Sequence, residues 1–230
     1  MRELRIPESG PKRRLLETAE QLFAERGFDM VAVRDITGLA KSNVAAVNYY
    51  FGSREELIRL VIYRYATPIG EERLARLEAV EKKWSGKMPP LEEVIEAYVR
   101  PLSGIAKKTN LPDAGYHMLV GRILSLPGNV FPQETELITQ SAAARFIRVL
   151  AKALPTVSGE ELIWRTHFLT GGMLHLLVHQ DEPRTLGEAA GTPTMDAILS
   201  RFIRFATAGL REGLPVEQAP SKGPQATFDF

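Results

Sequence analysis

Cysteine is absent from the 230 residues of this sequence, and so is any apolar run long enough to cross a bilayer. Without cysteine the chain forms no disulfide and has no thiolate chemistry, which is typical of a reducing compartment. The most apolar run, Phe168–Val178, is far shorter than the ~20 residues of a membrane-spanning helix. The N-terminus lacks the apolar core of a signal peptide. We therefore expect a soluble, cytoplasmic protein with no membrane partner.

An excess of charge of one sign is also lacking, because 29 Lys and Arg residues stand against 28 Asp and Glu residues, a net charge of +1. A nucleic-acid surface on such a chain must be local. Residues 1–11 are expected to form a flexible basic arm, and the basic residues continue through 12–14. Such an arm either is solvated or contacts the minor groove or backbone of DNA.

Alternating strand patterns are missing as well, and so are a P-loop, a dinucleotide-binding glycine pattern and a nucleophile elbow. Helical periodicity is present instead along most of the chain, whose length suits one or two domains. Residues 213–230 are rich in Pro, Gly, Gln and Ser and are predicted to be a disordered tail.

The N-terminal part is predicted to form four successive helices. Apolar residues at helical spacing mark the buried stripe of the first, over 12–26: Leu15, Ala19, Leu22 and Phe23. Gly27 follows, where a residue of positive φ ends many helices. Shorter helices are predicted over 33–40 and 44–51. A capping box at Ser53 and Glu56 opens a fourth helix that ends near Ala66.

Longer helical periods follow Pro68. We predict helices over 68–84, 90–109, 113–125, 132–154, 158–180 and 194–212, separated by turns that contain Pro or Gly. Pro101 falls inside one of these periods and should kink or split it. The chain is thus predicted to be all-α, with one helical domain over 12–66 and a second over 67–212.

The segment SNVAAVNYYF, residues 42–51, has two contrasting faces. Val44, Val47 and Phe51 fall within an arc of about 60° and are expected to face the core. The side chains of the opposite face and its flanks are small, amide or phenolic: Ser42, Asn43, Ala45, Ala46, Asn48 and Tyr49. That face has almost no bulk.

A helix with so little bulk can enter the major groove of DNA closely. Asn can pair with an adenine edge, and alanine methyls can contact a thymine methyl. Tyr49 and Tyr50, at the end of the helix, can donate to phosphate oxygens, and Arg54 in the next helix would make a second phosphate contact. The helices over 33–40 and 44–51 are therefore predicted to form a helix-turn-helix whose second helix reads DNA.

The stretch KRRLLETAEQLFAERGFDMVAVRDITGLAKSNVAAVNYYFGSREELIRLVI, residues 12–62, resembles the N-terminal domain of TetR-type one-component transcriptional regulators. Residues at the spacing of that family carry the resemblance: Phe23, Gly27-Phe28, Val33-Arg34-Asp35-Ile36, Tyr49, Phe51-Gly52, Arg54 and Leu57. The resemblance implies an N-terminal three-helix bundle with a helix-turn-helix and a C-terminal helical domain that binds a ligand and dimerises. The segment AAVNYYFGS is similar to subgroups that include regulators of fatty-acid metabolism and of toxic-compound efflux.

Two positions depart from the pattern of the family. Lys41-Ser42 stands where Gly-Val is usual, so a lysine occupies a turn position that often needs a positive φ. Val31-Ala32 replaces the usual Thr or Ser before the second helix, which removes an N-cap worth ~1 kcal/mol. We expect a less rigid DNA-reading unit, in which Lys41 contacts a phosphate in partial compensation.

The resemblance further implies a homodimer on a pseudo-palindromic operator in double-stranded DNA. A repressor released by a small hydrophobic effector, an acyl chain or an aromatic compound, is the favoured interpretation. Because the last long helices of such proteins pair across the dimer axis, we place the interface on 132–154 and 194–212. Ile198, Phe202 and Phe205 form an apolar stripe there. Helix 158–180 is the alternative.

The effector pocket is predicted around Pro101, because a kinked helix leaves room between its neighbours and methionine adapts to varied apolar shapes. The candidate pocket residues are Tyr98, Leu102, Ile105, Tyr116, Met118, Leu119, Arg122, Ile123, His167, Met173 and His175. Arg122 or a histidine would anchor a carboxylate or thioester carbonyl. The same side chains would equally fill a solid core.

Three histidines share a helical side, because His175 and His179 are four residues apart and His167 lies two turns earlier. A metal site would use this spacing, but no HExxH order and no cysteine accompany it. Core or pocket histidines are therefore favoured, and no metal, cofactor or catalytic residue is assigned. Two alternatives stay open: a metal-dependent helical enzyme built on these histidines, and an interaction module that has lost DNA binding.

Overall fold

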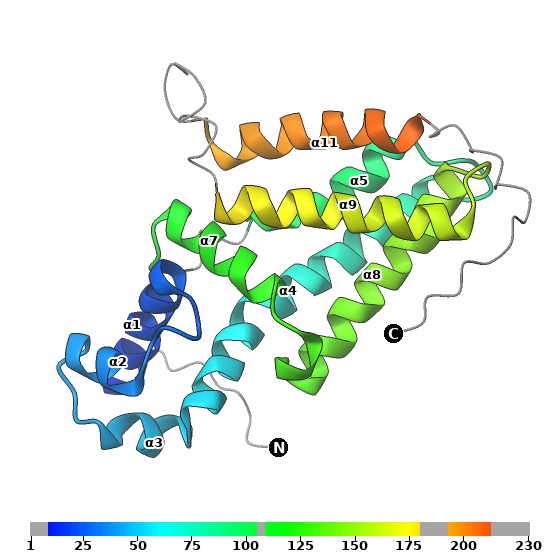
Figure 1. Cartoon of the computed structure of the whole chain (residues 1–230). Coiled ribbons are helices and arrows are strands. Elements are labelled where there is room, and N and C mark those ends of the chain that lie inside the picture. Colours follow the sequence, from blue (N-terminus) through cyan, green and yellow to red (C-terminus); the bar gives the residue numbers. More distant parts are fainter. Residues whose placement is uncertain (1–8, 105–108, 180–192, 213–230) are drawn as a thin grey trace, which may run out of the picture.

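Helices make up the regular structure of the chain in the computed structural model, which describes residues 9–104, 109–179 and 193–212 (Figure 1). The elements are α1 (Pro11–Arg26), α2 (Val33–Leu39), α3 (Ala45–Phe51), α4 (Arg54–Lys83), α5 (Leu91–Val99), α6 (Pro101–Gly104), α7 (Asp113–Leu124), the 3-10 turn η2 (Gly128–Val130), α8 (Gln133–Ala153), α9 (Gly159–Val178) and α11 (Met195–Arg211). These ranges contain no strand, so the all-α prediction is confirmed. None of the helices within them is long and apolar enough to cross a membrane.

Three predictions concern residues outside these ranges. They are most of the basic arm over 1–11, the pocket candidate Ile105, and the tail over 213–230.

The first three helices form a small bundle whose core is the predicted stripe of α1. Its four apolar residues, Leu15, Ala19, Leu22 and Phe23, are buried. Gly27 ends α1 with a φ of 85°, and its N–H donates to the Phe23 carbonyl. The Phe28 ring then folds back on the Phe23 ring, with the ring centroids 4.8 Å apart. The loop after α1 is therefore part of the core.

The prediction that a helix ends before Pro68 is wrong, because α4 contains this proline. The cap is as predicted, because the Ser53 side chain accepts from the Glu56 N–H, but the helix continues for 30 residues through Pro68. Proline inside a helix costs ~3 kcal/mol. Ile62, Tyr65 and Ile69 flank it and are buried, and each such side chain contributes ~1.5–3 kcal/mol. The free energy gained from this burial thus exceeds the cost of the backbone hydrogen bond that Pro68 cannot make. The predicted boundary between the two domains, at residues 66 and 67, therefore lies inside one helix.

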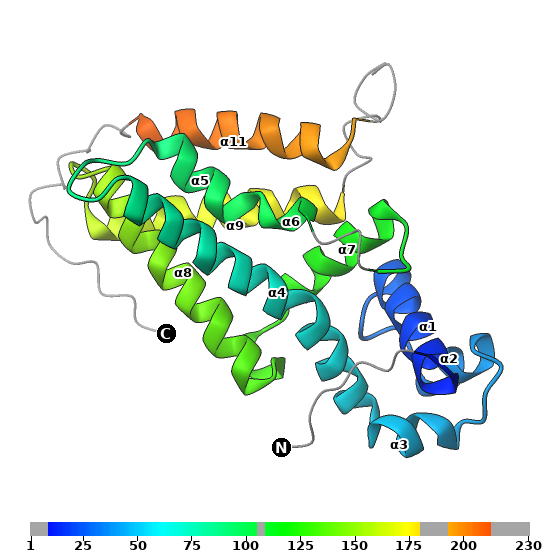
Figure 2. The ribbon, with the colours of Figure 1, turned by 180° about the vertical axis from the view of Figure 1, so that it is seen from behind.

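Helices α4 and α8 pack against each other, as the view from behind shows (Figure 2). A Cβ on Gly70 would lie 2.5 Å from the Ile138 side chain, so only glycine permits this approach. Beside it the hydroxyl oxygens of Thr67 and Thr135 are 2.8 Å apart and buried. Helix α4 therefore packs on α1 and α3 at one end and on α8 at the other.

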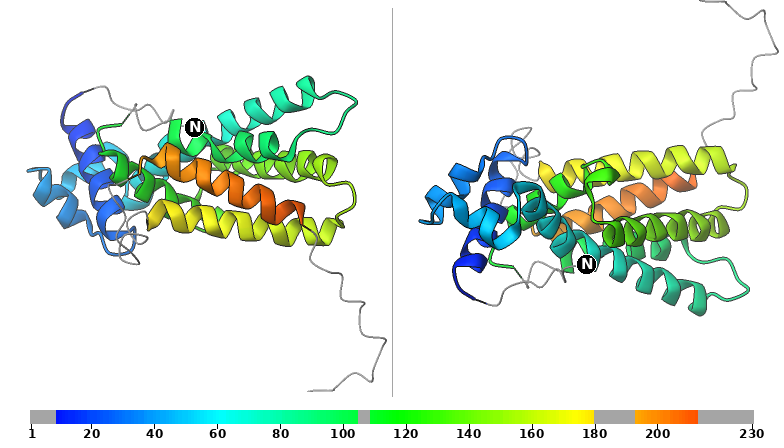
Figure 3. Two further views of the ribbon diagram at one scale, coloured as in Figure 1. Left: turned by 90° about the horizontal axis from the view of Figure 1, so that it is seen from above. Right: turned by 90° about the horizontal axis from the view of Figure 1, so that it is seen from below.

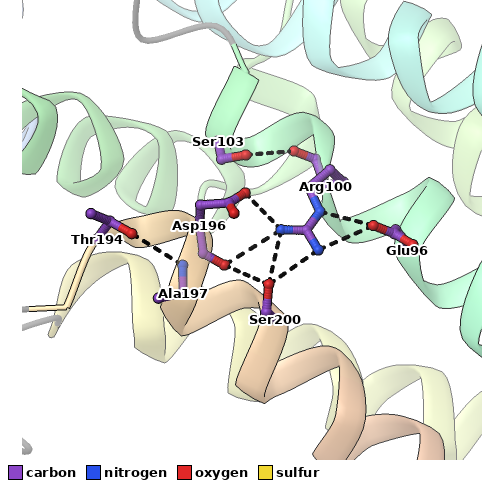
Figure 4. A network of polar contacts seen from close by, with 7 residues as sticks. All are labelled: Glu96, Arg100, Ser103, Thr194, Asp196, Ala197 and Ser200. Atoms are coloured by element: carbon purple, nitrogen blue, oxygen red, sulfur yellow. Dashed lines mark hydrogen bonds and ion pairs between the residues drawn. The ribbon is translucent and has the colours of Figure 1, made fainter.

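Pro101 splits the predicted helix over 90–109 into α5 and α6. Arg100, at the break, binds the first turns of α11 (Figure 4). Its guanidinium donates to the Asp196 carboxylate at 2.7 Å and the Ser200 hydroxyl at 3.3 Å. The Thr194 hydroxyl caps the same helix by accepting from the Ala197 N–H. The break is thus fastened to an element almost 100 residues away in sequence.

Helices α9 and α11 form an outer layer over α5, α7 and α8, as the views from above and below show (Figure 3). The apolar stripe predicted for α11, Ile198, Phe202 and Phe205, does not lie on one side of the helix: part faces the core and part faces outward. Phe202 is buried against Gly172 of α9, whereas Phe205 is 77% exposed. Because positions three apart on a helix differ by ~60°, a stripe at the edge of the core can face both ways.

A buried acid lies where α1 meets α4. Glu20 of α1 is buried, and one carboxylate oxygen is 3.2 Å from the Arg64 guanidinium of α4. Burial raises the pKa of Glu20 to about 7, although Arg64 opposes the rise. Burial and the charge of Glu20 also raise the pKa of the adjacent Tyr65 hydroxyl. The two helices therefore meet around a carboxyl that titrates near neutral pH.

This titration makes stability depend on pH. The pKa of Glu20 rises from its ordinary value of 4.5 to about 7 on folding, so the folded chain holds the proton more tightly. The resulting stabilisation is complete below pH 4.5 and is lost as the pH rises to 7. Relative to the wild type, Glu20→Gln should therefore gain unfolding free energy between pH 5 and 8, by about 2–3 kcal/mol.

Urea unfolding of both proteins at the two pH values measures this gain. Glu25→Gln, at an exposed position of α1, controls for the loss of a negative charge alone. Parallel pH profiles for the wild type and Glu20→Gln would contradict the prediction.

Candidate nucleic-acid interface

Helices α2 and α3 are joined by a tight turn over residues 40–44. The Ala40 N–H donates to the Ile36 carbonyl and the Ser42 N–H to the Thr37 carbonyl, both at 2.9 Å. Lys41 between them has a φ of 50°, the one positive value among the non-glycine residues that the structure describes. The prediction of a lysine in a left-handed turn position is confirmed. That conformation costs ~1–2 kcal/mol for a residue other than glycine.

The start of α2 keeps half of a capping box. Ala32 has no side-chain acceptor, as predicted, but the Asp35 carboxylate accepts from the Ala32 N–H at 2.8 Å. At the start of α3 the Asn43 side-chain oxygen accepts from the Ala45 N–H at 2.9 Å. Asn43 therefore caps the predicted reading helix, a role that the sequence interpretation missed. Both short helices begin with an amide or carboxylate acceptor.

The exposed face of α3 is the one predicted from its small and amide side chains. Lys41, Asn43, Ala45, Asn48 and Tyr49 are exposed, and Ser42, Ala46 and Tyr50 are partly buried. The Tyr49 side chain is 82% exposed and meets the Tyr50 ring edge-on, with centroids 4.9 Å apart. Residues 36–53 contain no Asp or Glu. The turn and α3 thus present amides, methyls and hydroxyls without negative charge.

The prediction that Val44, Val47 and Phe51 all face the core is wrong for Val44. Val47 is buried and Phe51 partly buried, but Val44 is 50% exposed. The reason is that α3 begins at Ala45, one residue later than the predicted helix, so Val44 lies in its N-terminal cap. Its side chain joins the exposed face, where an apolar group suits a thymine methyl.

Arg54 has a structural role that the sequence interpretation did not include. Its Nε donates to the Val31 carbonyl at 3.0 Å, and its Nη2 donates to the Phe28 carbonyl. The side chain is partly buried and ties the start of α4 to the loop after α1. Nη1 makes neither of these bonds and can still donate to a phosphate, the role predicted for Arg54.

Two family models match the chain. The model described as bacterial regulatory proteins, tetR family, matches residues 15–61, and the tetracyclin repressor-like C-terminal domain matches residues 96–209. The chain belongs to the TetR family. The first match covers α1 to α3 and the start of α4, and the second runs from α5 into α11. The resemblance predicted from residues 12–62 is confirmed.

Individual proteins are similar to this chain in sequence or in fold. The HTH-type transcriptional dual regulator CecR of Shigella flexneri is 28% identical over 130 residues, which are 50% of this chain and 58% of that protein. A TetR-family transcriptional regulator from Bordetella parapertussis 12822 has a similar fold, with a TM-score of 0.57, 16% identity and coverage of 85% of this chain and 93% of that chain. For the TetR-family regulator PfmR from Thermus thermophilus the TM-score is 0.55 at 16% identity, covering 86% and 100%.

Among the residues that the structure describes, most of the predicted effector-pocket residues of this TetR-family chain lie in the core or in three separate hollows. Leu102, Tyr116, Leu119 and Ile123 are fully buried in the core. Tyr98 and Met173 line a pocket of about 220 Å³. Arg122 and His175 line a separate hollow of about 450 Å³ beside the loop after α1. Met118 lines a third hollow, of about 840 Å³, between α1 and residues 110–118.

The three predicted histidines lie at the surface, so the core position expected for them is wrong, whereas His175 and His179 line the hollow beside the loop after α1. His167, His175 and His179 are exposed, and the rings of His175 and His179 stack with centroids 4.7 Å apart. In the described ranges no group of three His, Cys, Asp or Glu side chains could hold a metal ion. The site that the metal-dependent alternative needs is therefore not formed by these residues.

Sequence interpretation missed two buried polar residues in the second domain. His117 is buried, and burial lowers the pKa of its imidazole, which favours the neutral ring. Arg73 is buried in α4 and lines the pocket that Tyr98 and Met173 line. A signal for Arg73 was present, because it interrupts the apolar stripe of Ile69, Leu77 and Val80 at helical spacing.

Arg54→Ala should lower the stability of the protein. The change removes two charge-assisted hydrogen bonds and leaves two loop carbonyls without a donor, a loss of about 2 kcal/mol. For a chain of this length that lowers Tm by about 4–8 °C. Tyr49→Ala, at an exposed position of the same unit, should change stability by no more than about 0.5 kcal/mol. Thermal unfolding of both variants measures these changes in stability. An unchanged Tm for Arg54→Ala would contradict the structural role of Arg54 and leave the phosphate contact as its one proposed role.

Proposed function

We propose that this chain is a cytoplasmic, homodimeric, sequence-specific DNA-binding regulator, and that it acts as a repressor released by a small hydrophobic ligand. The observation that carries the proposal is the exposed face of α3, which offers small side chains, two amides and a tyrosine without a carboxylate. Membership of the TetR family, and the name of the relative CecR as a transcriptional regulator, support it.

The physical fit of α3 to the major groove favours this function. Ala45 and Ala46 let the helix backbone approach the base edges, and Asn48 supplies a donor and an acceptor for an adenine. Tyr49 and Tyr50 follow at the end of the helix, where hydroxyls suit phosphate oxygens. Lys41 and the guanidinium of Arg54 add positive charge at the two ends of the reading unit.

Dimerisation is supported by an apolar face on the outer layer. Ile163, Trp164 and Phe168 of α9 and Phe205 of α11 are large apolar side chains, each more than half exposed. The Trp164 and Phe168 rings stack with centroids 6.1 Å apart, so they form one continuous surface. Helix α8, part of the predicted interface, packs along α4 and exposes one large apolar residue, Leu137. We therefore assign the interface to α9 and α11 in place of α8 and α11.

Release by a ligand requires a connection between the two parts of the chain. Helix α4 supplies it, because the same helix begins at the DNA-reading unit and ends in the second domain. A ligand that favours one position of α4 would change the distance between two α3 helices, which must lie ~34–36 Å apart to enter successive major grooves. Such coupling typically changes affinity by ~1–3 kcal/mol.

Binding to the DNA that flanks its own gene, at several salt concentrations, tests DNA reading. Asn48→Ala should change the preference among operator variants, because a side chain on a base edge carries sequence information. Tyr49→Phe should weaken binding to all of the variants by about the same factor. An unchanged preference would remove Asn48 from base reading, and the absence of specific binding at any salt would overturn the proposal.

The dimer interface is tested by sedimentation of charge variants. Phe168→Glu and Phe205→Glu should each shift the protein from dimer to monomer, because a carboxylate would be buried without a partner in the interface. Leu137→Glu on α8, at a position of similar exposure, should leave the dimer intact. Dissociation by Leu137→Glu alone would instead favour the predicted interface on α8.

A further inference from the structure

Arg73 is a buried cation in an apolar part of the fold. It lies in α4 between Ile69 and Leu77, both buried, and its own side chain is only 5% exposed. Arginine stays protonated in proteins, so this position holds a full positive charge. Burial nevertheless lowers the pKa of Arg73, the direction expected when a cation loses water. The surroundings therefore have to stabilise that charge.

The contacts of Arg73 supply dipoles but no anion. Its Nε donates to the Tyr98 carbonyl at 2.8 Å, and its Nη2 contacts the Met173 sulfur at 3.6 Å. Its guanidinium lies over the Tyr98 ring, 4.0 Å from the centroid. Among the residues that the structure describes, it forms no ion pair with a carboxylate. These contacts use two of its five N–H donors.

A second buried arginine in the same chain, Arg165, has its positive charge balanced by a carboxylate. Arg165 of α9 is 7% exposed, and its Nε lies 2.8 Å from the Glu161 carboxylate. Its Nη1 also donates to the Leu210 carbonyl at 2.6 Å. Arg73 has the carbonyl contact but lacks the carboxylate. A buried charge without a partner is strongly unfavourable, so a missing anion at Arg73 needs an explanation.

Arg73 lines a pocket with room for such an anion. The pocket is about 220 Å³ in volume, and its apolar wall includes Leu124, Phe131 and Met173. At ~30 Å³ for each water molecule, it has space for about seven waters, or one short organic molecule. Its one acid, Glu136, accepts from the Gln140 amide at 3.0 Å and forms no ion pair with Arg73. The pocket thus has a cationic wall, an apolar wall and a polar edge.

We propose that the effector is a small carboxylic acid with an apolar body, whose carboxylate pairs with the guanidinium of Arg73 in this pocket. A carboxylate matches the planar fork of the guanidinium and supplies the negative charge that the site lacks. The effect of the ligand on DNA rests on the proposed function, whereas its binding does not. Arg73 thus replaces Arg122 and the histidines as the predicted anchor of the carboxylate.

The position of Arg73 connects this ligand to the DNA-reading unit. Arg73 and Arg54 are 19 residues apart on α4, about 28 Å along the helix axis at ~1.5 Å per residue. Pro68 lies between them, at the point where α4 crosses α8. The Tyr98 carbonyl that Arg73 binds is in the last turn of α5, next to the break at Pro101. A carboxylate on the remaining N–H donors of Arg73 would lie beside that contact between α4 and α5 and so act on both helices.

Thermal unfolding of the purified full-length protein tests the proposal, with hexanoate and benzoate as probes. Both should raise Tm by about 5–10 °C at a concentration about 100-fold above their Kd. The neutral amides hexanamide and benzamide, which keep the apolar body, should raise it much less. Equal shifts by acids and amides would overturn the proposal, because the guanidinium would then contribute nothing to selectivity.

Arg73→Met is the decisive variant. It should abolish the shift caused by the acids, with at least about a 100-fold loss of affinity, and should unfold at the same Tm as the free wild type or higher. Arg165→Met, which breaks a paired buried arginine, should lower Tm but keep the response to hexanoate. Retention of the response in Arg73→Met would refute the site. Should that variant fail to fold, calorimetric titration of the wild type with hexanoate against hexanamide decides instead.

The DNA-binding assay separates this inference from the proposed function. Specific DNA binding, with no Tm shift by either acid, would overturn the carboxylate site and leave the regulator. A shift lost in Arg73→Met, together with no specific DNA binding, would support the site and overturn the regulator.

Discussion

The packing of α4 is the constraint on which the rest of this structure depends. One helix of 30 residues contributes Leu57, Val61, Tyr65, Ile69 and Leu77 to a single hydrophobic core. The close approach at Gly70 fixes how α4 crosses α8. The two parts of the chain therefore cannot move independently, since a shift of α4 at one end is carried along the helix to the other.

A second connection runs through the loop after α1. Arg54 holds this loop from the side of the reading unit, through the Phe28 and Val31 carbonyls. On the other side, Arg122 of α7 contacts the last turn of α1, with Nη2 3.4 Å from the Glu25 carbonyl. A Cβ on Gly27 would lie 2.6 Å from Arg122 Nη1. Glycine at this position therefore allows both the positive φ and the close approach of the Arg122 side chain. The loop thus links α7 to the start of α4.

Three buried charged groups show how differently this fold treats charge. Glu20 has an arginine near it and still binds its proton tightly, because its burial outweighs the attraction of Arg64. Arg165 has both a carboxylate and a carbonyl. Arg73 has a carbonyl, a sulfur and an aromatic ring, which stabilise a cation without neutralising it. A ligand of opposite charge therefore gains most at Arg73.

Local patterns in the sequence determined the helical class, most helix limits, the break at Pro101, the left-handed Lys41 and the polar face of α3. Each depends on residues within a few turns of one another, where spacing and backbone preference decide the outcome.

The tertiary structure decided the rest. Pro68 stays inside α4 because distant side chains bury its neighbours, and packing leaves Val44, His167 and His175 exposed. Arg73 lies against Tyr98 and Met173, 25 and 100 residues away in sequence. Such contacts leave no periodic signal, because they arise only when helices far apart in the chain pack together.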